Sequence, residues 1–241
     1  MILKIILRSI QTILQNFVPA IRLTALPWSL LALMQVSLVG SENPAEARRA
    51  IPLLMILSLP IVVWIFVGWH RFILLKEGPA LFGPRWKGDA IKLYFWKAFV
   101  LTASMLLISV PFLFALFVIG SVFQIAKIAM ISSWVCSGAI IAIWLRNSLV
   151  LPAAAIGVDM KQHESWAKTK GAWPSFAVLA AAMLASKVGL NFFEVLTVQA
   201  VENNVAATVI VAVAKAFFCL LYISILTTLY GHLVEGRELT P

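Results

Sequence analysis

The chain has 241 residues, of which 62% are hydrophobic and 12% are charged, and its formal net charge is +9. A soluble domain carries about 25% charged residues, so this composition leaves too little polar surface for a water-soluble fold and excludes one. The cations flank apolar runs and do not form a block, which excludes a nucleic-acid partner. We therefore expect an all-α, polytopic integral membrane bundle: six transmembrane helices plus amphipathic interfacial helices, in a single membrane domain over residues 1–241.

The first expected element is an interfacial amphipathic helix over residues 1–18. Lys4, Arg8, Gln11 and Gln15 recur at helical spacing among Ile, Leu and Phe. Such a helix presents a cationic face to lipid headgroups while its apolar face stays in the acyl region. Pro19 is expected to end it.

Apolar runs long enough to cross a bilayer, at about 20 residues each, fill most of the remaining chain. One boundary stays open, because Asn191, Glu194 and Glu202 form a partial polar stripe, and residues 191–205 are either span or interfacial helix. The six spans are expected near residues 23–40, 51–69, 98–119, 128–146, 173–192 and 206–229.

The distribution of Lys and Arg sets the expected orientation. Fourteen of the nineteen lie in the N-terminal segment, in the 70–97 and 146–170 connections or at Arg237, and three lie in the alternate connections. Cytoplasmic loops carry the excess of Lys and Arg. The asymmetry requires an even number of spans, and we expect a bacterial inner (cytoplasmic) membrane protein with N- and C-termini both cytoplasmic.

Three charged residues are expected within or beside the last two spans, at Lys187, Glu194 and Lys215. Charges at membrane depth are costly and are functional hypotheses by default. If the turn between these spans centres near Asn203, Glu194 and Lys215 reach similar depth and can pair. The three residues serve either as a helix–helix ion pair plus a snorkelling lysine, which we favour, or as the polar pathway of a transporter or channel.

Basic residues next to the spans are candidate contacts for lipid headgroups, because a phosphate is recognised by clustered Lys and Arg. The simpler interpretation is a set of solvated cations that only fix topology. The candidates are Lys4, Arg8, Arg71, Lys76, Arg85, Lys87 and Arg146.

Motifs that carry enzyme chemistry are missing from the sequence. It has no nucleophile elbow, no phosphate-binding glycine loop, no dinucleotide fingerprint and no HExxH helix. His70, His163 and His232 lack the close spacing of metal ligands. We expect no catalytic residues, no metal and no cofactor.

Two stretches resemble a known group of membrane proteins. Residues 69–79 read Trp-His-Arg-Phe-Ile-Leu-Leu-Lys-Glu-Gly-Pro, and residues 146–155 read Arg-Asn-Ser-Leu-Val-Leu-Pro-Ala-Ala-Ala, followed at 164–171 by Glu-Ser-Trp-Ala-Lys-Thr-Lys-Gly. Together they resemble uncharacterised, alphaproteobacterial-type six-span inner-membrane proteins. More distantly, they are similar to the YciC-like group and to the membrane domain of some glycerophosphodiester phosphodiesterases. The resemblance implies a six-span helical fold with interfacial helices, and it brings no catalytic residues.

These observations favour a non-enzymatic membrane protein that acts through membrane lipids or partner membrane-protein subunits, as scaffold, accessory subunit or assembly factor. A small-solute or ion transporter using Lys187, Glu194 and Lys215 is the first alternative. A lipid-modifying enzyme, resting on the basic 76–97 connection, is the second.

Overall fold

The computed structural model describes residues 1–39, 44–81, 83–122 and 126–239, and over these residues it contains helices and no strands. Six helices (α2, α3, α4, α5, α8 and α9) are long and apolar enough to cross a membrane, which confirms the expected number. The elements are α1 (Ile2–Gln15), α2 (Phe17–Val39), α3 (Pro44–Leu75), α4 (Gly88–Val122), α5 (Ala126–Asn147), α6 (Val150–Ala155), α7 (Gln162–Lys168), α8 (Trp173–Ala200) and α9 (Asn204–Leu233).

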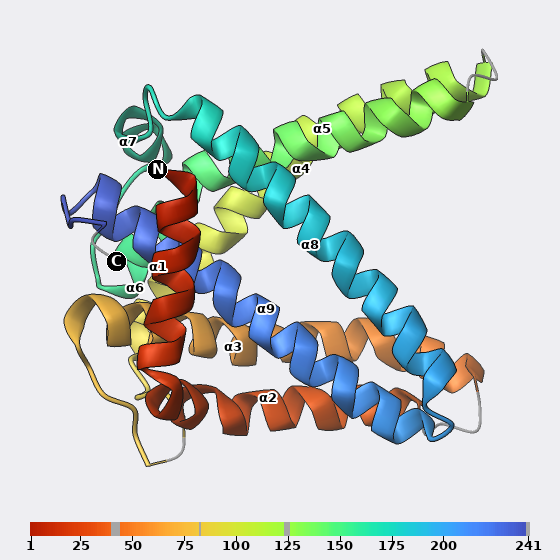
Figure 1. Cartoon of the computed structure of the whole chain (residues 1–241), viewed down its shortest axis with the longest axis horizontal. Helices are drawn as coiled ribbons and strands as arrows, with labels where there is room; N and C mark the ends of the chain where they lie inside the picture. The colour runs from red at the N-terminus through yellow and green to blue at the C-terminus, as the bar shows by residue number, and fades with distance from the viewer. Residues whose placement is uncertain (40–43, 82, 123–125, 240–241) are drawn as a thin grey trace.

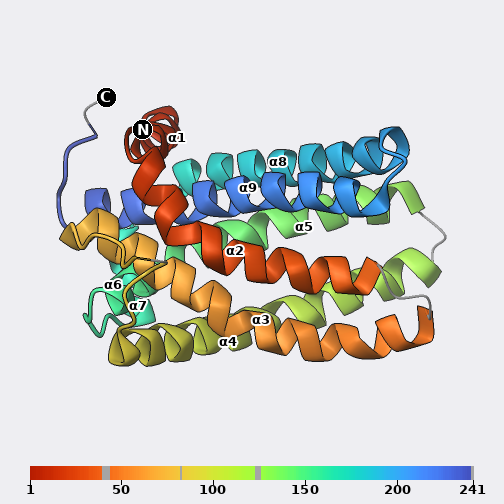
Figure 2. The same cartoon turned by 90° about the horizontal axis from the view of Figure 1, so that it is seen from below.

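Both chain termini lie at the same end of the bundle, as an even number of long helices requires (Figures 1 and 2). The short helices α6 and α7 and the connection from α3 to α4 are at this end too. We call it the termini end. The last residues of α2, α4 and α8 and the first residues of α3, α5 and α9 lie at the opposite end.

The boundary between the first two helices differs from the expected one. The break falls at Asn16, whose φ is −114°, so α1 ends at Gln15 and α2 begins at Phe17. The prediction that Pro19 ends the first helix is therefore wrong, and the first apolar helix begins earlier than residue 23. Proline is tolerated in the first helical turn, where its missing N–H would have had no helical partner.

Helix α1 lies across the termini end, crosswise to the long helices (Figures 1 and 2). It has three sides. Ile5, Ser9 and Ile13 are buried against the bundle, and Ser9 accepts a hydrogen bond from Ser224 Oγ of α9 at its carbonyl, 3.1 Å away. The second side holds the polar residues of the amphipathic pattern. The third side is apolar and exposed, through Leu3, Leu7 and Leu14.

The surface of the long helices is apolar where it is exposed. Leu107 of α4 is 78% exposed, and the neighbouring Ile108 is 52% exposed. Helices α3 and α4 continue through Pro60 and Pro111 without a break. Water cannot solvate such a surface cheaply, so these faces fit a lipid solvent.

The densest packing is at the termini end. All six residues of α6 are buried, and they contact α3, α4 and α9. The opposite half is more open, because the α4–α5 hairpin diverges there from α8 (Figure 1). Helix α8 runs unbroken to Ala200, so residues 191–200 extend the fifth long helix and form no separate interfacial element.

Candidate functional site

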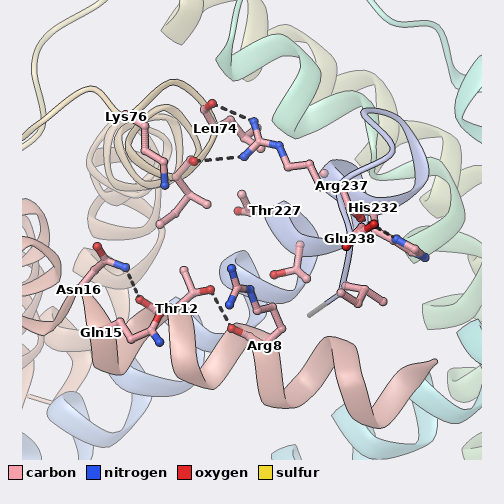
Figure 3. Close-up of a pocket in the computed structure, with 14 residues that line it drawn as sticks. Arg8, Thr12, Gln15, Asn16, Leu74, Lys76, Thr227, His232, Arg237 and Glu238 are labelled. Carbon is pink, nitrogen blue, oxygen red and sulfur yellow. Dashed lines mark hydrogen bonds between the residues drawn. The ribbon is translucent and has the colours of Figure 1, made fainter. Parts of the chain in front are cut away.

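A polar pocket of about 160 Å³ lies at the termini end, between α1, the last turns of α3 and α9, and the segment after α9 (Figure 3). Two of the seven candidate headgroup residues line it, Arg8 and Lys76, which are far apart in the sequence. The complete lining is Arg8, Thr12, Gln15, Asn16, Ile73, Leu74, Lys76, Thr227, Thr228, Gly231, His232, Arg237, Glu238 and Leu239.

Arg237 is fixed at the wall of this pocket. Its Nη2 donates to the Leu74 carbonyl at 2.9 Å, and its Nη1 lies 3.5 Å from the Ile73 carbonyl (Figure 3). Its Nε pairs with the carboxylate of Glu235 at 2.6 Å. The guanidinium therefore satisfies carbonyls at the C-terminal end of α3, where a helix carries unpaired acceptors and partial negative charge.

Arg8 and Lys76 are the cations left available to a ligand. Neither forms an ion pair with any residue that the structure describes. The lining holds one carboxylate, that of Glu238, against the cations Arg8, Lys76 and Arg237. The pocket therefore has an excess of positive charge and favours an anion.

Lys76 occupies an unusual backbone position. Its φ is +58°, in the left-handed region, one residue after α3 ends. Glycine fills the positive-φ positions that follow α6 and α9, at Gly157 and Gly236. A side chain in this conformation costs about 1–2 kcal/mol, and such strain concentrates at functional sites. The strained backbone makes Lys76 a candidate functional residue of this pocket.

Beneath the pocket, α3 and α9 are joined by a buried pair of polar side chains. Thr227 Oγ1 donates to the Ile223 carbonyl at 2.8 Å and lies 2.8 Å from His70 Nδ1. Since that hydroxyl already donates, it accepts from the Nδ1–H of His70. His70 has no exposed surface and its ring lies against Tyr94, with centroids 5.8 Å apart. This contact fixes the pocket floor.

Arg71, another of the seven candidate headgroup residues, is engaged inside the protein. Its Nε and Nη2 donate to the two carboxylate oxygens of Glu77 at 2.8 and 2.5 Å, and its Nη1 donates to the Ala155 carbonyl at 2.8 Å. The hydrogen bond from Arg71 is the main cause of a lowered pKa of the Glu77 carboxyl. Arg71 thus joins α3 to the end of α6.

Arg146, a further candidate headgroup residue, is also engaged internally. Its Nε donates to Thr169 Oγ1 at 3.1 Å and its Nη2 to the Trp166 carbonyl at 3.3 Å. The guanidinium lies 3.6 Å from the centroid of the Trp166 ring. In return, Ser165 Oγ donates to the Arg146 carbonyl at 2.5 Å. Arg146 therefore holds α7 against the end of α5. The remaining candidates, Lys4, Arg85 and Lys87, are exposed and outside the pocket.

The charged residues expected at membrane depth divide into two groups. Lys215 of α9 donates to Glu194 of α8 at 2.8 Å, so the expected pairing is confirmed. The two side chains are 39% and 40% exposed, respectively. Lys187 does not join them. It lines a different cavity, of about 640 Å³, between α4, α5 and α8.

The sequence interpretation missed His232 and Arg237 as pocket residues. One signal is present in hindsight: Gly231 lies in the last turns of α9, and a Cβ there would come within 3.2 Å of Arg237 Cδ. The missing side chain lets Arg237 fold back over the helix.

Comparisons with known proteins add nothing further, since no family model, no curated protein and no solved structure matches the chain.

Proposed function

We propose that this chain is an integral inner-membrane protein, with both termini cytoplasmic, that acts through anionic lipids and performs no chemistry of its own. The pocket at the termini end binds the phosphate of a lipid headgroup. The observation that supports this most directly is the convergence of Arg8 and Lys76, neither of them paired with an acid in the described part of the chain, on one pocket.

The dimensions and position of the pocket fit a headgroup. At about 160 Å³ it is smaller than the 300–1,000 Å³ typical of sites that enclose a whole small molecule. It therefore suits a polar group whose acyl chains stay outside. The exposed leucines of α1 supply an apolar surface next to it. Anionic lipids of the cytoplasmic leaflet attract basic residues at this depth.

The test uses full-length protein in nanodiscs that contain neutral lipid, titrated with an anionic glycerophospholipid, with thermal unfolding as the readout. Arg8→Gln is expected to remove most of the stabilisation by the anionic lipid, because a charged hydrogen bond contributes about 1.5–3 kcal/mol. Lys4→Gln is the matched control, since it removes one charge from the same helix outside the pocket.

Equal losses in Arg8→Gln and Lys4→Gln would mean that diffuse surface charge attracts the lipid and that the pocket does not. Inorganic phosphate serves as a third arm. If free phosphate stabilises the protein as well as the lipid does, the ligand is a soluble phosphate and the lipid proposal is wrong.

Lys76→Gly separates folding from binding at the same pocket. Glycine adopts positive φ without steric cost, so the unliganded variant is expected to unfold at the same or a higher temperature than the wild type. Its stabilisation by anionic lipid is expected to fall, because the ammonium group is gone. A loss of stability without lipid, together with unchanged lipid response, would contradict the assignment of Lys76 to binding.

A further inference from the structure

A second cavity, of about 640 Å³, lies where the α4–α5 hairpin diverges from α8 (Figure 1). It has an apolar wall, which includes Leu113, Trp134 and Val188. It also has polar groups from three helices, among them Lys187 of α8 and Ser137 of α5. The cavity is thus amphipathic, and it is separate from the pocket at the termini end.

Lys187 lies near the midpoint of α8, which runs from Trp173 to Ala200. A cation at the centre of a span costs about 2.5–3.5 kcal/mol on the insertion scale. The chain offsets this cost for Lys215 with Glu194. Within the described ranges it provides no acid for Lys187. An anion supplied from outside the chain would complete the site.

Hydroxyl and amide groups around Lys187 are available as well. Serines in these helices commonly donate to a carbonyl of the preceding turn, as Ser104 does to Val100 at 2.7 Å. Ser109 and Ser137 make no such hydrogen bond to any described residue, and neither does the Asn191 side chain. Polar groups at this depth usually find a partner, and these three line the same cavity as Lys187.

We propose that this cavity binds an acidic amphiphile, a single long alkyl chain that ends in a carboxylate or a phosphate. The acidic group accepts hydrogen bonds from Lys187, Ser109, Ser137 and Asn191. The alkyl chain lies along the apolar wall and continues into the surrounding lipid. The volume falls within the 300–1,000 Å³ range of small-molecule sites.

An acidic side chain on the transmembrane helix of a partner protein is the competing occupant. A helix with its side chains is about 10–12 Å across, and α5 and α8 contact each other nearer the termini end (Figure 1). The donors come from three helices and converge on one volume. That arrangement fits a compact group with several acceptor oxygens at the end of a thin chain better than it fits a rigid rod.

The test measures binding of a brominated long-chain fatty acid to the full-length protein in nanodiscs, by quenching of Trp134 fluorescence relative to a Trp134→Phe variant. Lys187→Met is expected to weaken binding about tenfold or more, the loss for one charged hydrogen bond. Lys187→Arg keeps the cation and is expected to bind nearly as well as the wild type.

Two further ligands define the acidic group. The corresponding brominated alcohol is expected not to compete with the fatty acid. An alkyl phosphate of the same chain length is compared with the fatty acid, and the tighter binder of the two shows whether the natural acidic group is a phosphate or a carboxylate. Unchanged fatty-acid binding in Lys187→Met, or equal binding of the alcohol, would overturn the proposal. So would a photo-crosslinker at position 187 that captures a protein in native membranes while neither acid binds.

Folding is controlled separately. Because Lys187→Met removes a cation that has no internal partner among the described residues, the unliganded variant is expected to unfold at the same or a higher temperature than the wild type. If it unfolds at a lower temperature and the fatty acid stabilises it as much as the wild type, Lys187 has a structural role and the proposal is wrong.

Discussion

Replacing Arg146 by Met is expected to release α7 from the bundle while the long helices stay packed. The hydrogen bond to Thr169, at 3.1 Å, is a charged one and contributes about 1.5–3 kcal/mol. The one to the Trp166 carbonyl is long, at 3.3 Å, and contributes less. The guanidinium over the Trp166 ring adds about 0.5–2 kcal/mol. Allowing for relaxation, we expect a loss of about 2–4 kcal/mol in the stability of the α7 attachment.

Hydrogen exchange at the backbone amides of residues 162–170 measures this attachment directly. A loss of about 2–4 kcal/mol accelerates exchange at least about 30-fold. Arg146→Lys keeps the charge but loses the planar stack on Trp166 and the second hydrogen-bond donor. Its exchange rate is therefore expected to lie between those of Arg146→Met and the wild type. Arg85→Met, which removes an exposed cation from the same end, is the control. If Arg146→Met accelerates exchange no more than Arg85→Met, the internal role of Arg146 is refuted.

Three other expectations follow from the same structure. Glu194→Gln or Lys215→Met alone is expected to lower the unfolding temperature more than the double variant with both changes, because each single change leaves one charge unpaired; additive losses would show that the pair contributes nothing. The pKa of the Glu77 carboxyl is lowered in the folded protein from its ordinary value of 4.5, mainly by the hydrogen bond from Arg71. The ionised carboxylate therefore stabilises the fold at any pH above 4.5, and this stabilisation is lost as the pH falls through the lowered pKa. Glu77→Gln is expected to flatten that part of the stability profile, and an unchanged profile would contradict it. A cysteine in place of the exposed His163 is expected to react with an impermeant thiol reagent only after the cells are opened. Labelling of this cysteine in intact cells would show that the orientation is the reverse of the predicted one.

The number and positions of the long helices were predictable because they depend on local hydropathy. Each apolar run is close to or above the length of about 20 residues that a bilayer requires, and no distant contact is needed to recognise it. Local hydropathy could not predict the end of α8, because polar residues interrupt the apolar run there. Asn191 and Glu194 read as polar in the sequence. The pairing of Glu194 with Lys215 was expected only if the turn centred near Asn203, and the structure confirms that pairing.

The roles of the basic residues depended on contacts that a sequence does not contain. Arg8, Arg71 and Arg146 all have the same local character, a cation beside an apolar run. Arg71 and Arg146 find partners across the fold, in the Ala155 carbonyl and in Thr169. Arg8 finds no acid in the described part of the chain and faces a pocket. Proximity to a span identifies candidates, and long-range packing decides which of them remain free.

The contact between α1 and α9 has a consequence for biosynthesis. Ser9 lies 3.0 Å from Thr228 Oγ1, and the two residues are 219 positions apart. At a translation rate of about 5–20 residues per second, the buried face of α1 waits on the order of 10–45 s for the helix that covers it. During that interval the buried side of α1, which carries Ser9, has no α9 to pack against. A shortened chain that lacks α9 would leave the buried side of α1 uncovered permanently.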